Sequence, residues 1–297
     1  ITMRSALTAE ENSRPSGHID KYISPFRYPG GKSWFMDHVR RWLKAQTKKP
    51  KVLVEPFGGG AGVSLISVNE KLVERAVFSE IDRDVAATWK TVLNGHAAWL
   101  ANEILTFRVS RERVEKKLKE NPKTDHERAF QCLLKNRTTR GGVLSVGAGL
   151  IRSGENGKGL KSRWYPETLS NRIQAIARLK GQLHFSQSDA FKVIRQYLDQ
   201  ADTVFFVDPP YTQAARRLYT HWSLEHEKVF KLLRDAKGQV LMTYDDTKEV
   251  RMWANRYGFK VRRISMRTTH HQHKRELMIS RDFDWLKTKK VLGSVSN

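Results

Sequence analysis

The chain has 297 residues, which is enough to bury a sizeable core in one large domain or two smaller ones. Its 54 Lys and Arg residues outnumber 31 Asp and Glu, and the net charge of +23 favours a polyanionic partner, nucleic acid before an anionic membrane. A single cysteine, Cys132, excludes intramolecular disulfides and fits a reducing compartment. No apolar run approaches the roughly 18 residues of a membrane span, so we expect a soluble, cytoplasmic protein. Residues 1–20 are polar and lack apolar periodicity, which predicts a flexible arm and no signal peptide.

The first candidate site is the Gly-rich stretch Tyr28-Pro29-Gly30-Gly31-Lys32-Ser33. Two glycines allow the backbone to approach a ligand closely, and Ser33 is placed to cap a helix that follows. A lysine beside glycines suggests a phosphate cradle, but no Gly stands five residues before Gly31, so the spacing is not that of a P-loop. A purely structural turn explains this stretch equally well.

A strand over 51–54, a glycine turn and a helix over 63–72 are expected next, in the order of a nucleotide-binding βα unit. The turn is Glu55-Pro56-Phe57-Gly58-Gly59-Gly60-Ala61-Gly62. A further strand over 76–78 leads to Glu80 and Ile81, and an acid about 20 positions past the glycines is suited to bind ribose hydroxyls. NAD binding is the rival interpretation, but Val63 or Leu65 stands where the third Gly of that fingerprint is needed. A nucleoside cofactor without a pyrophosphate fits better.

The stretch from about 85 to 166 is predicted to begin with helices over 85–93, 97–105, 111–119 and 127–135. It continues as a Gly-rich segment over 137–150 that reads as an irregular hairpin or loop. Basic residues then alternate with Gly, Trp164 and Tyr165, a mixture that favours contact with nucleic acid over a merely solvated surface. These basic residues are Arg137, Arg140, Arg152, Lys158, Lys161 and Arg163.

The strongest motif is Asp208-Pro209-Pro210-Tyr211, which follows the apolar run 203–207. Such a run predicts a buried central strand, and open α/β sheets bind ligands past the carboxyl ends of their strands. The prolines make the backbone rigid and leave carbonyl acceptors between a carboxylate and an aromatic ring. Two acceptors and a stacking face fit an aminopurine. The alternative is a strand and turn whose Asp and Tyr are incidental.

The remaining elements complete an alternation of helices and strands. Helices are expected over 168–181, from Ala190, from Ser223 and over 248–258, with strands over 183–186, 240–243, 259–265 and 276–280. Asp189 is placed to cap the helix from Ala190. No second ligand cluster accompanies His270, His271 and His273, so we predict no metal site and interpret their loop as basic and close to phosphate.

The order of three motifs resembles a known family. Tyr28-Pro29-Gly30-Gly31-Lys32, Glu55-Pro56-Phe57-Gly58-Gly59-Gly60 and Asp208-Pro209-Pro210-Tyr211 occur as in the Dam-type DNA adenine-N6 methyltransferases, the D12 class or alpha group. The resemblance covers about residues 23–281, and Asn136-Arg137, Tyr219 and Arg275-Glu276-Leu277 also look like family positions. It implies an α/β, Rossmann-like methyltransferase fold with a mixed seven-stranded sheet. The implied division is an arm over 1–20, a cofactor-binding part over 21–84, an inserted, mainly helical target-recognition domain over 85–166, and the rest of the catalytic domain over 167–297.

The resemblance implies methyl transfer from S-adenosylmethionine to N6 of an adenine flipped out of double-stranded DNA in a bacterial or phage setting. It is compatible with a monomer or homodimer and with a partner restriction endonuclease. Catalytic roles fall on Asp208, Pro209, Pro210 and Tyr211. Cofactor contacts fall on Tyr28, Gly30, Gly31, Lys32, Glu55, Pro56, Phe57, Gly58, Gly60, Glu80, Ile81, Asp189, Ala190 and Asp208. DNA contacts fall on Arg137, Arg140, Arg152, Lys158, Lys161, Arg163 and Tyr219.

Other activities remain open. RNA adenine-N6 and DNA cytosine-N4 methyltransferases use the same acceptors, although the motif order and the large insertion argue against both. A catalytically inactive DNA-binding relative is a further alternative, which the intact Asp208 motif disfavours. Arg140-Gly141-Gly142-Val143 departs from the Asn-Gly-Leu hairpin core of family members that read GATC, so the resemblance does not imply a GATC target.

Overall fold

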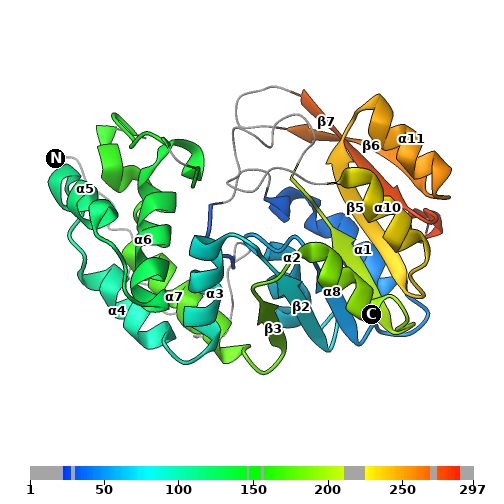
Figure 1. The fold of residues 1–297 in the computed structure, drawn as a ribbon, viewed down its shortest axis with the longest axis horizontal. Helices are drawn as coiled ribbons and strands as arrows, with labels where there is room; N and C mark the ends of the chain where they lie inside the picture. Colours follow the sequence, from blue (N-terminus) through cyan, green and yellow to red (C-terminus); the bar gives the residue numbers. More distant parts are fainter. Residues whose placement is uncertain are drawn as a thin grey trace, which may run out of the picture.

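The computed structural model describes residues 23–27, 31–145, 147–154, 157–210, 225–267 and 273–287. These residues form a seven-stranded sheet in the order β3-β2-β1-β4-β5-β7-β6 (Figure 1). Strands β1 to β5 are parallel to one another, and β7 is antiparallel to both β5 and β6. The expected mixed sheet is therefore confirmed. The strands are β1 (Val52–Glu55), β2 (Arg75–Ser79), β3 (Leu183–Ser186), β4 (Thr203–Val207), β5 (Gln239–Asp245), β6 (Lys260–Arg267) and β7 (His273–Ser280).

Successive side chains of a strand point to opposite faces, so each buried strand supplies two cores. On β1, Leu53 belongs to one hydrophobic cluster, and Val52 and Val54 belong to the other. The first cluster includes α1 (Met36–Lys44) and α2 (Gly62–Asn69). The second includes α8 (Ala190–Tyr197), α10 (His226–Arg234) and α11 (Lys248–Arg256). Helices thus cover both faces of the sheet and leave the ends of its strands for ligands.

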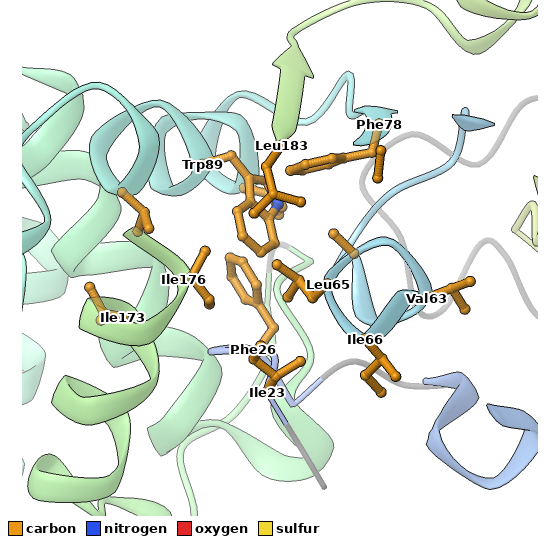
Figure 2. Packing of buried hydrophobic residues seen from close by; sticks show 14 of the residues in the cluster. Ile23, Phe26, Val63, Leu65, Ile66, Phe78, Trp89, Ile173, Ile176 and Leu183 are labelled. Atoms are coloured by element: carbon orange, nitrogen blue, oxygen red, sulfur yellow. The ribbon is translucent and has the colours of Figure 1, made fainter. Parts of the chain in front are cut away.

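A group of helices lies beside the sheet (Figure 1). It consists of α3 (Arg83–Leu93), α4 (Ala97–Thr106), α5 (Arg111–Lys119), α6 (Asp125–Thr138) and α7 (Pro166–Arg178). Figure 2 shows where this group meets the sheet: Phe26 packs near Leu65, Ile176 and Trp89. The rings of Trp89 and Phe78 on β2 meet edge to face, with centroids 5.1 Å apart. The helical part and the sheet therefore share one hydrophobic core.

The bounds of β3, β4 and α5 are those predicted, and most other elements differ by one to three residues. Ser33 does not cap a helix, because the chain already turns at Lys32 and the 3-10 helix η2 (Lys32–Phe35) leads directly into α1 without a side-chain cap. The Gly-rich segment is irregular, as expected. It contains a short 3-10 turn (Arg140–Gly142), and a single antiparallel bridge between Thr139 and Leu150 closes it.

Candidate active site

The centre of the candidate site is Asp208, which stands at the carboxyl end of β4 in the middle of the sheet. Its Oδ1 atom accepts a hydrogen bond of 2.7 Å from the Thr243 hydroxyl and lies 3.0 Å from Nζ of Lys32. Burial raises the pKa of Asp208 above its ordinary value, whereas the charge of Lys32 and the bond from Thr243 act in the opposite direction. The Asp208 side chain is still 20 % exposed, so a substrate can reach it.

Lys32 is almost fully buried, and its ammonium lies between two carboxylates. Besides Asp208, it contacts Oε2 of Glu276 at 3.6 Å. Glu276 comes from β7, where it is paired in register with Asp245 at the end of β5. A phosphate at Lys32 would have to displace both acidic partners, so the stretch 28–33 does not act as a phosphate cradle through this lysine.

The glycine turn after β1 is held by hydrogen bonds rather than by bulky side chains. Glu55, which ends β1, is buried, and its Oε2 atom accepts a hydrogen bond of 2.8 Å from the backbone N–H of Ser64 in α2. Burial raises the pKa of Glu55 to about 7, and Asp208 adds to the rise through charge repulsion. The N–H of Gly58 donates to the Ser79 carbonyl at 2.8 Å, and a β-carbon at Gly58 would lie 3.0 Å from that oxygen. Only glycine keeps this approach relaxed.

Glu80 follows β2 at the same edge of the sheet. Its Oε1 atom accepts hydrogen bonds from the N–H groups of Ile81 at 2.7 Å and Asp82 at 2.9 Å, which fix the carboxylate. Burial raises the pKa of Glu80 to about 7, and the backbone of Gly59 acts against that rise. Glu80 and the glycine turn are therefore neighbours in space, as an acid and a turn that share one nucleoside must be.

Asp189 caps α8, as predicted. Its Oδ1 atom accepts from the N–H groups of Phe191 at 2.8 Å and Lys192 at 3.3 Å. Both bonds use the same oxygen, and within the described residues Oδ2 accepts none. A second role for this carboxylate is thus compatible with the cap. Ala190, its neighbour, is buried, whereas Ile81 is 47 % exposed.

The basic residues of the inserted part do not share one environment. Arg140, Arg152, Lys158 and Lys161 are exposed, and Arg163 is half-buried. Arg137 is buried, its Nη2 donates to the Pro25 carbonyl, and burial lowers its pKa to about 10. This placement contradicts the expectation that Arg137 contacts DNA, because its guanidinium is used inside the protein.

Asn136 was noticed in the sequence without a role, and the structure gives it one. Its Oδ1 accepts from the N–H of Arg27 at 2.8 Å, and its Nδ2 donates to the carbonyls of Arg27 at 3.1 Å and Gly142 at 2.8 Å. Gly142 has φ +73°, and a β-carbon there would collide with the Arg27 carbonyl. The Gly-rich loop is therefore fastened to the segment that leads into the motif 28–32.

Several predicted residues lie outside the described part of the chain. They are Tyr28, Pro29, Gly30, Tyr211, Tyr219, His270 and His271, together with the arm over 1–20. Within the described ranges, no three His, Cys, Asp or Glu side chains are grouped so that they could hold a metal ion. No helix in the same ranges is long and apolar enough to span a bilayer. Cys132 is buried, and burial raises the pKa of its thiol well above the ordinary value, which is unsuited to a nucleophile.

Three solved structures are similar to this chain at low TM-score and low sequence identity. The rRNA methyltransferase AviRa of Streptomyces viridochromogenes has a TM-score of 0.40 and 14 % identity over 86 % of this chain and 87 % of that one. Magnesium protoporphyrin IX methyltransferase of Synechocystis PCC 6803 has a TM-score of 0.38 and 11 % identity, over 84 % of this chain and 82 % of that one. The tRNA methyltransferase TrmK of B. subtilis has 0.37 and 8 %, over 83 % of this chain and 66 % of that one, so the chain spans just under two thirds of it.

Among the curated proteins compared, none matches the sequence. A family model does match, over residues 28–269, and this range contains all three ordered motifs together with Asp208 and its partners Lys32 and Thr243, whereas Glu276 lies beyond it. Its description is D12 class N6 adenine-specific DNA methyltransferase. The match covers most of the chain, and the mixed seven-stranded sheet is that expected of an S-adenosylmethionine-dependent methyltransferase. The chain belongs to the D12 class of N6 adenine-specific DNA methyltransferases.

Proposed function

We propose that this protein methylates N6 of an adenine that is flipped out of double-stranded DNA, at a specific sequence. The observation that carries the proposal is the partly exposed carboxylate of Asp208, followed by two prolines, at the carboxyl end of the central strand β4 of a D12 chain. The net charge of +23 supports a polyanionic substrate. An adenine inside a duplex is out of reach, so the base must leave the stack at a cost of a few kcal/mol.

The family uses S-adenosylmethionine, and the residues at this edge of the sheet fit it. Glu80 is suited to accept bonds from ribose hydroxyls, and Oδ2 of Asp189 to accept one from the adenine amino group of the cofactor. The lack of a side chain at Gly58 lets the glycine turn pack closely against the end of β2, which keeps the turn beside Glu80. The acidic side chains Glu55 and Asp208 suit a positively charged sulfonium, and the cofactor supplies an electrophilic methyl group on that sulfur.

The protein's own part in the reaction is to orient a weak nucleophile. The N6 lone pair of adenine is delocalised into the ring. We propose that the Asp208 carboxylate and the Pro209 carbonyl each accept a hydrogen bond from one of the two N6–H groups. These two bonds favour a tetrahedral nitrogen whose lone pair points at the methyl group. Tyr211 is proposed to stack on the base, worth about 1–3 kcal/mol. Orientation and electrostatics then provide most of the acceleration, and no covalent enzyme intermediate is required.

A direct assay tests this function. The purified protein is incubated with S-adenosylmethionine and either duplex DNA or RNA, and the digested nucleosides are analysed for methylated bases. We expect N6-methyladenine from duplex DNA. N4-methylcytosine, or product from RNA alone, would select the corresponding alternative activity. Methylation mapping of a host genome with and without the gene then gives the target sequence.

We further propose that residues 85–166 read the target and that exposed Arg140 contacts a base. Arg can bind guanine O6 and N7 with two bonds, at about 1–3 kcal/mol of discrimination per good pair. Exposed Lys161 is better suited to a phosphate, which positions the protein without carrying sequence information. Arg140→Ala is expected to relax preference at one position of the site and to leave the salt dependence of binding nearly unchanged.

The matched control is Lys161→Ala, which is expected to weaken binding to all sequences alike and to reduce the slope of log K against log salt by about 1. Both variants are profiled on randomised duplex DNA and by binding at several salt concentrations. If Arg140→Ala keeps its site preference and loses only overall affinity, Arg140 is a phosphate contact instead.

A further inference from the structure

Four elements that are distant in the sequence meet at the carboxylate of Asp208. Lys32 comes from η2, Thr243 from β5 and Glu276 from β7, while Asp208 itself directly follows β4. The Thr243 hydroxyl and the Lys32 ammonium both contact Oδ1 of Asp208, at 2.7 Å and 3.0 Å. Lys32 and Glu276 are both almost fully buried, with side chains 4 % and 2 % exposed. Buried charges of this kind are retained only where partners hold them.

The two contacts divide the carboxylate into two unlike oxygens. A carboxylate oxygen has two lone pairs, and Oδ1 already serves two donors. The remaining acceptor for an incoming amino group is therefore Oδ2. Because the Thr243 hydroxyl and the Lys32 ammonium come from separate elements, they also fix the rotation of the carboxylate.

We propose that Thr243 and Glu276 are positioning residues for methyl transfer. Thr243 holds Asp208 through Oδ1 so that Oδ2 receives the adenine amino group, and Glu276 holds the Lys32 ammonium against the same oxygen. This inference rests on the proposed adenine-N6 activity and adds to it the residues that orient its acceptor.

The charges around Asp208 predict the direction in which each substitution shifts the pKa of its carboxyl group. Among the residues that the structure describes, the groups around Asp208 are the cation Lys32 and the acidic or ionisable side chains Glu55 from β1, Tyr244 from β5 and Glu276 from β7. Lys32 is shared between two carboxylates, so Asp208 receives only part of its stabilisation. Removing the cation must raise the pKa of Asp208, whereas removing the second carboxylate must lower it.

The first experiment measures the titration of Asp208 without any activity assay. Protein labelled at the Asp side-chain carbons is titrated by NMR, and the Asp208 signal is assigned by its loss in Asp208→Asn. Lys32→Met is expected to raise the pKa of Asp208 by about 1–3 units, as for the loss of an opposite charge within contact distance. Glu276→Gln is expected to shift it downward. Lys32→Arg and Glu276→Asp keep the charges, so the pKa of Asp208 in these variants should be close to that in the wild type.

The second experiment measures orientation. Thr243→Val removes the hydroxyl at nearly constant volume and is expected to slow single-turnover methyl transfer about 10- to 100-fold, as the loss of a bond to a charged group. The affinity for S-adenosylmethionine should stay near wild type, because Asp208 keeps its place but not its rotation. Thr243→Ser restores the hydroxyl and should restore the rate. A thermal melt of each variant confirms that it is folded.

The outcomes distinguish a failure of the proposed adenine-N6 activity from a failure of the positioning roles of Thr243 and Glu276. If the wild type does not methylate adenine, the proposed function fails, while the NMR titration still reports on the network. If the wild type methylates adenine, a Glu276→Gln shift that is upward or absent overturns the role of Glu276. Equal rates for Thr243→Val and wild type overturn the role of Thr243. Should Lys32→Met not fold, Glu276→Gln and the Thr243 pair decide the matter alone.

Discussion

Replacing Asp208 by Asn is expected to lower the single-turnover rate of methyl transfer by about 10²- to 10³-fold, as for the loss of one preorganised polar contact to the reacting group. The substitution keeps the shape of the side chain and replaces one acceptor oxygen with a donor NH2 group. The donors on Thr243 and Lys32 attract the amide oxygen of the new side chain, so its NH2 group takes the place of Oδ2. A donor would then face the donor N6 of adenine.

The measurement is rapid-quench transfer with enzyme in excess over DNA, together with calorimetry of cofactor binding. We expect S-adenosylmethionine still to bind to the variant. Asp202→Asn is the matched control, because Asp202 precedes the other end of β4 and forms an exposed ion pair with Lys51 at 3.1 Å. Its rate should not change. A rate near wild type in Asp208→Asn would refute the proposed mechanism.

Glu80→Gln is expected to weaken the binding of S-adenosylmethionine by about 1.5–3 kcal/mol, the range for a hydrogen bond to a charged group, and to change DNA affinity little. The carboxylate is already held by two backbone N–H groups, so its bonds to ribose hydroxyls need no reorganisation. Glu74→Gln, an exposed substitution just before β2, is the matched control and should bind like wild type.

The same residue predicts the pH dependence of cofactor binding. Burial raises the pKa of Glu80 to about 7 in the free protein, and hydroxyl donors on the ligand favour the ionised form. The affinity for S-adenosylmethionine should therefore be constant above about pH 7. It should decline as the pH falls below 7, because the Glu80 carboxyl is then protonated in the free protein and must lose its proton when the cofactor binds. Calorimetry at several pH values should show this decline in the wild type and not in Glu80→Gln. A decline that persists in the variant would assign it to Glu55, whose pKa is also about 7.

Local sequence determined most of the framework. The run Thr203–Val207 has four consecutive apolar residues after Thr203, which is typical of a strand buried on both faces, and its bounds agree with the prediction. The motif that follows it therefore had to stand at the carboxyl edge of the sheet. Asp189 likewise had to begin α8, because a short acidic side chain satisfies the free N–H groups of a helix start. These features depend on neighbouring residues alone.

Arg137 shows how a small error in a local boundary changes a functional prediction. The sequence predicts a helix that ends near Lys135 and therefore places Arg137 in a basic loop. In the structure α6 continues to Thr138, so Arg137 lies one turn beyond buried Leu133 and two turns beyond buried Phe130, on the same face. The helical period, carried two residues further, would have predicted its burial.

Only the tertiary structure decided which groups surround Asp208. The order of the sheet places β5 next to β4, and β7 enters antiparallel beside β5, so Asp245 and Glu276 come into register. This pairing brings Thr243 and Glu276 to the level of Asp208, while η2 brings Lys32 from the other end of the chain. Thr243 is unremarkable in its local sequence, and the motifs that contain Lys32 and Glu276 do not indicate that these two side chains meet at Asp208. Their roles arise from long-range strand order, which no spacing along the chain encodes.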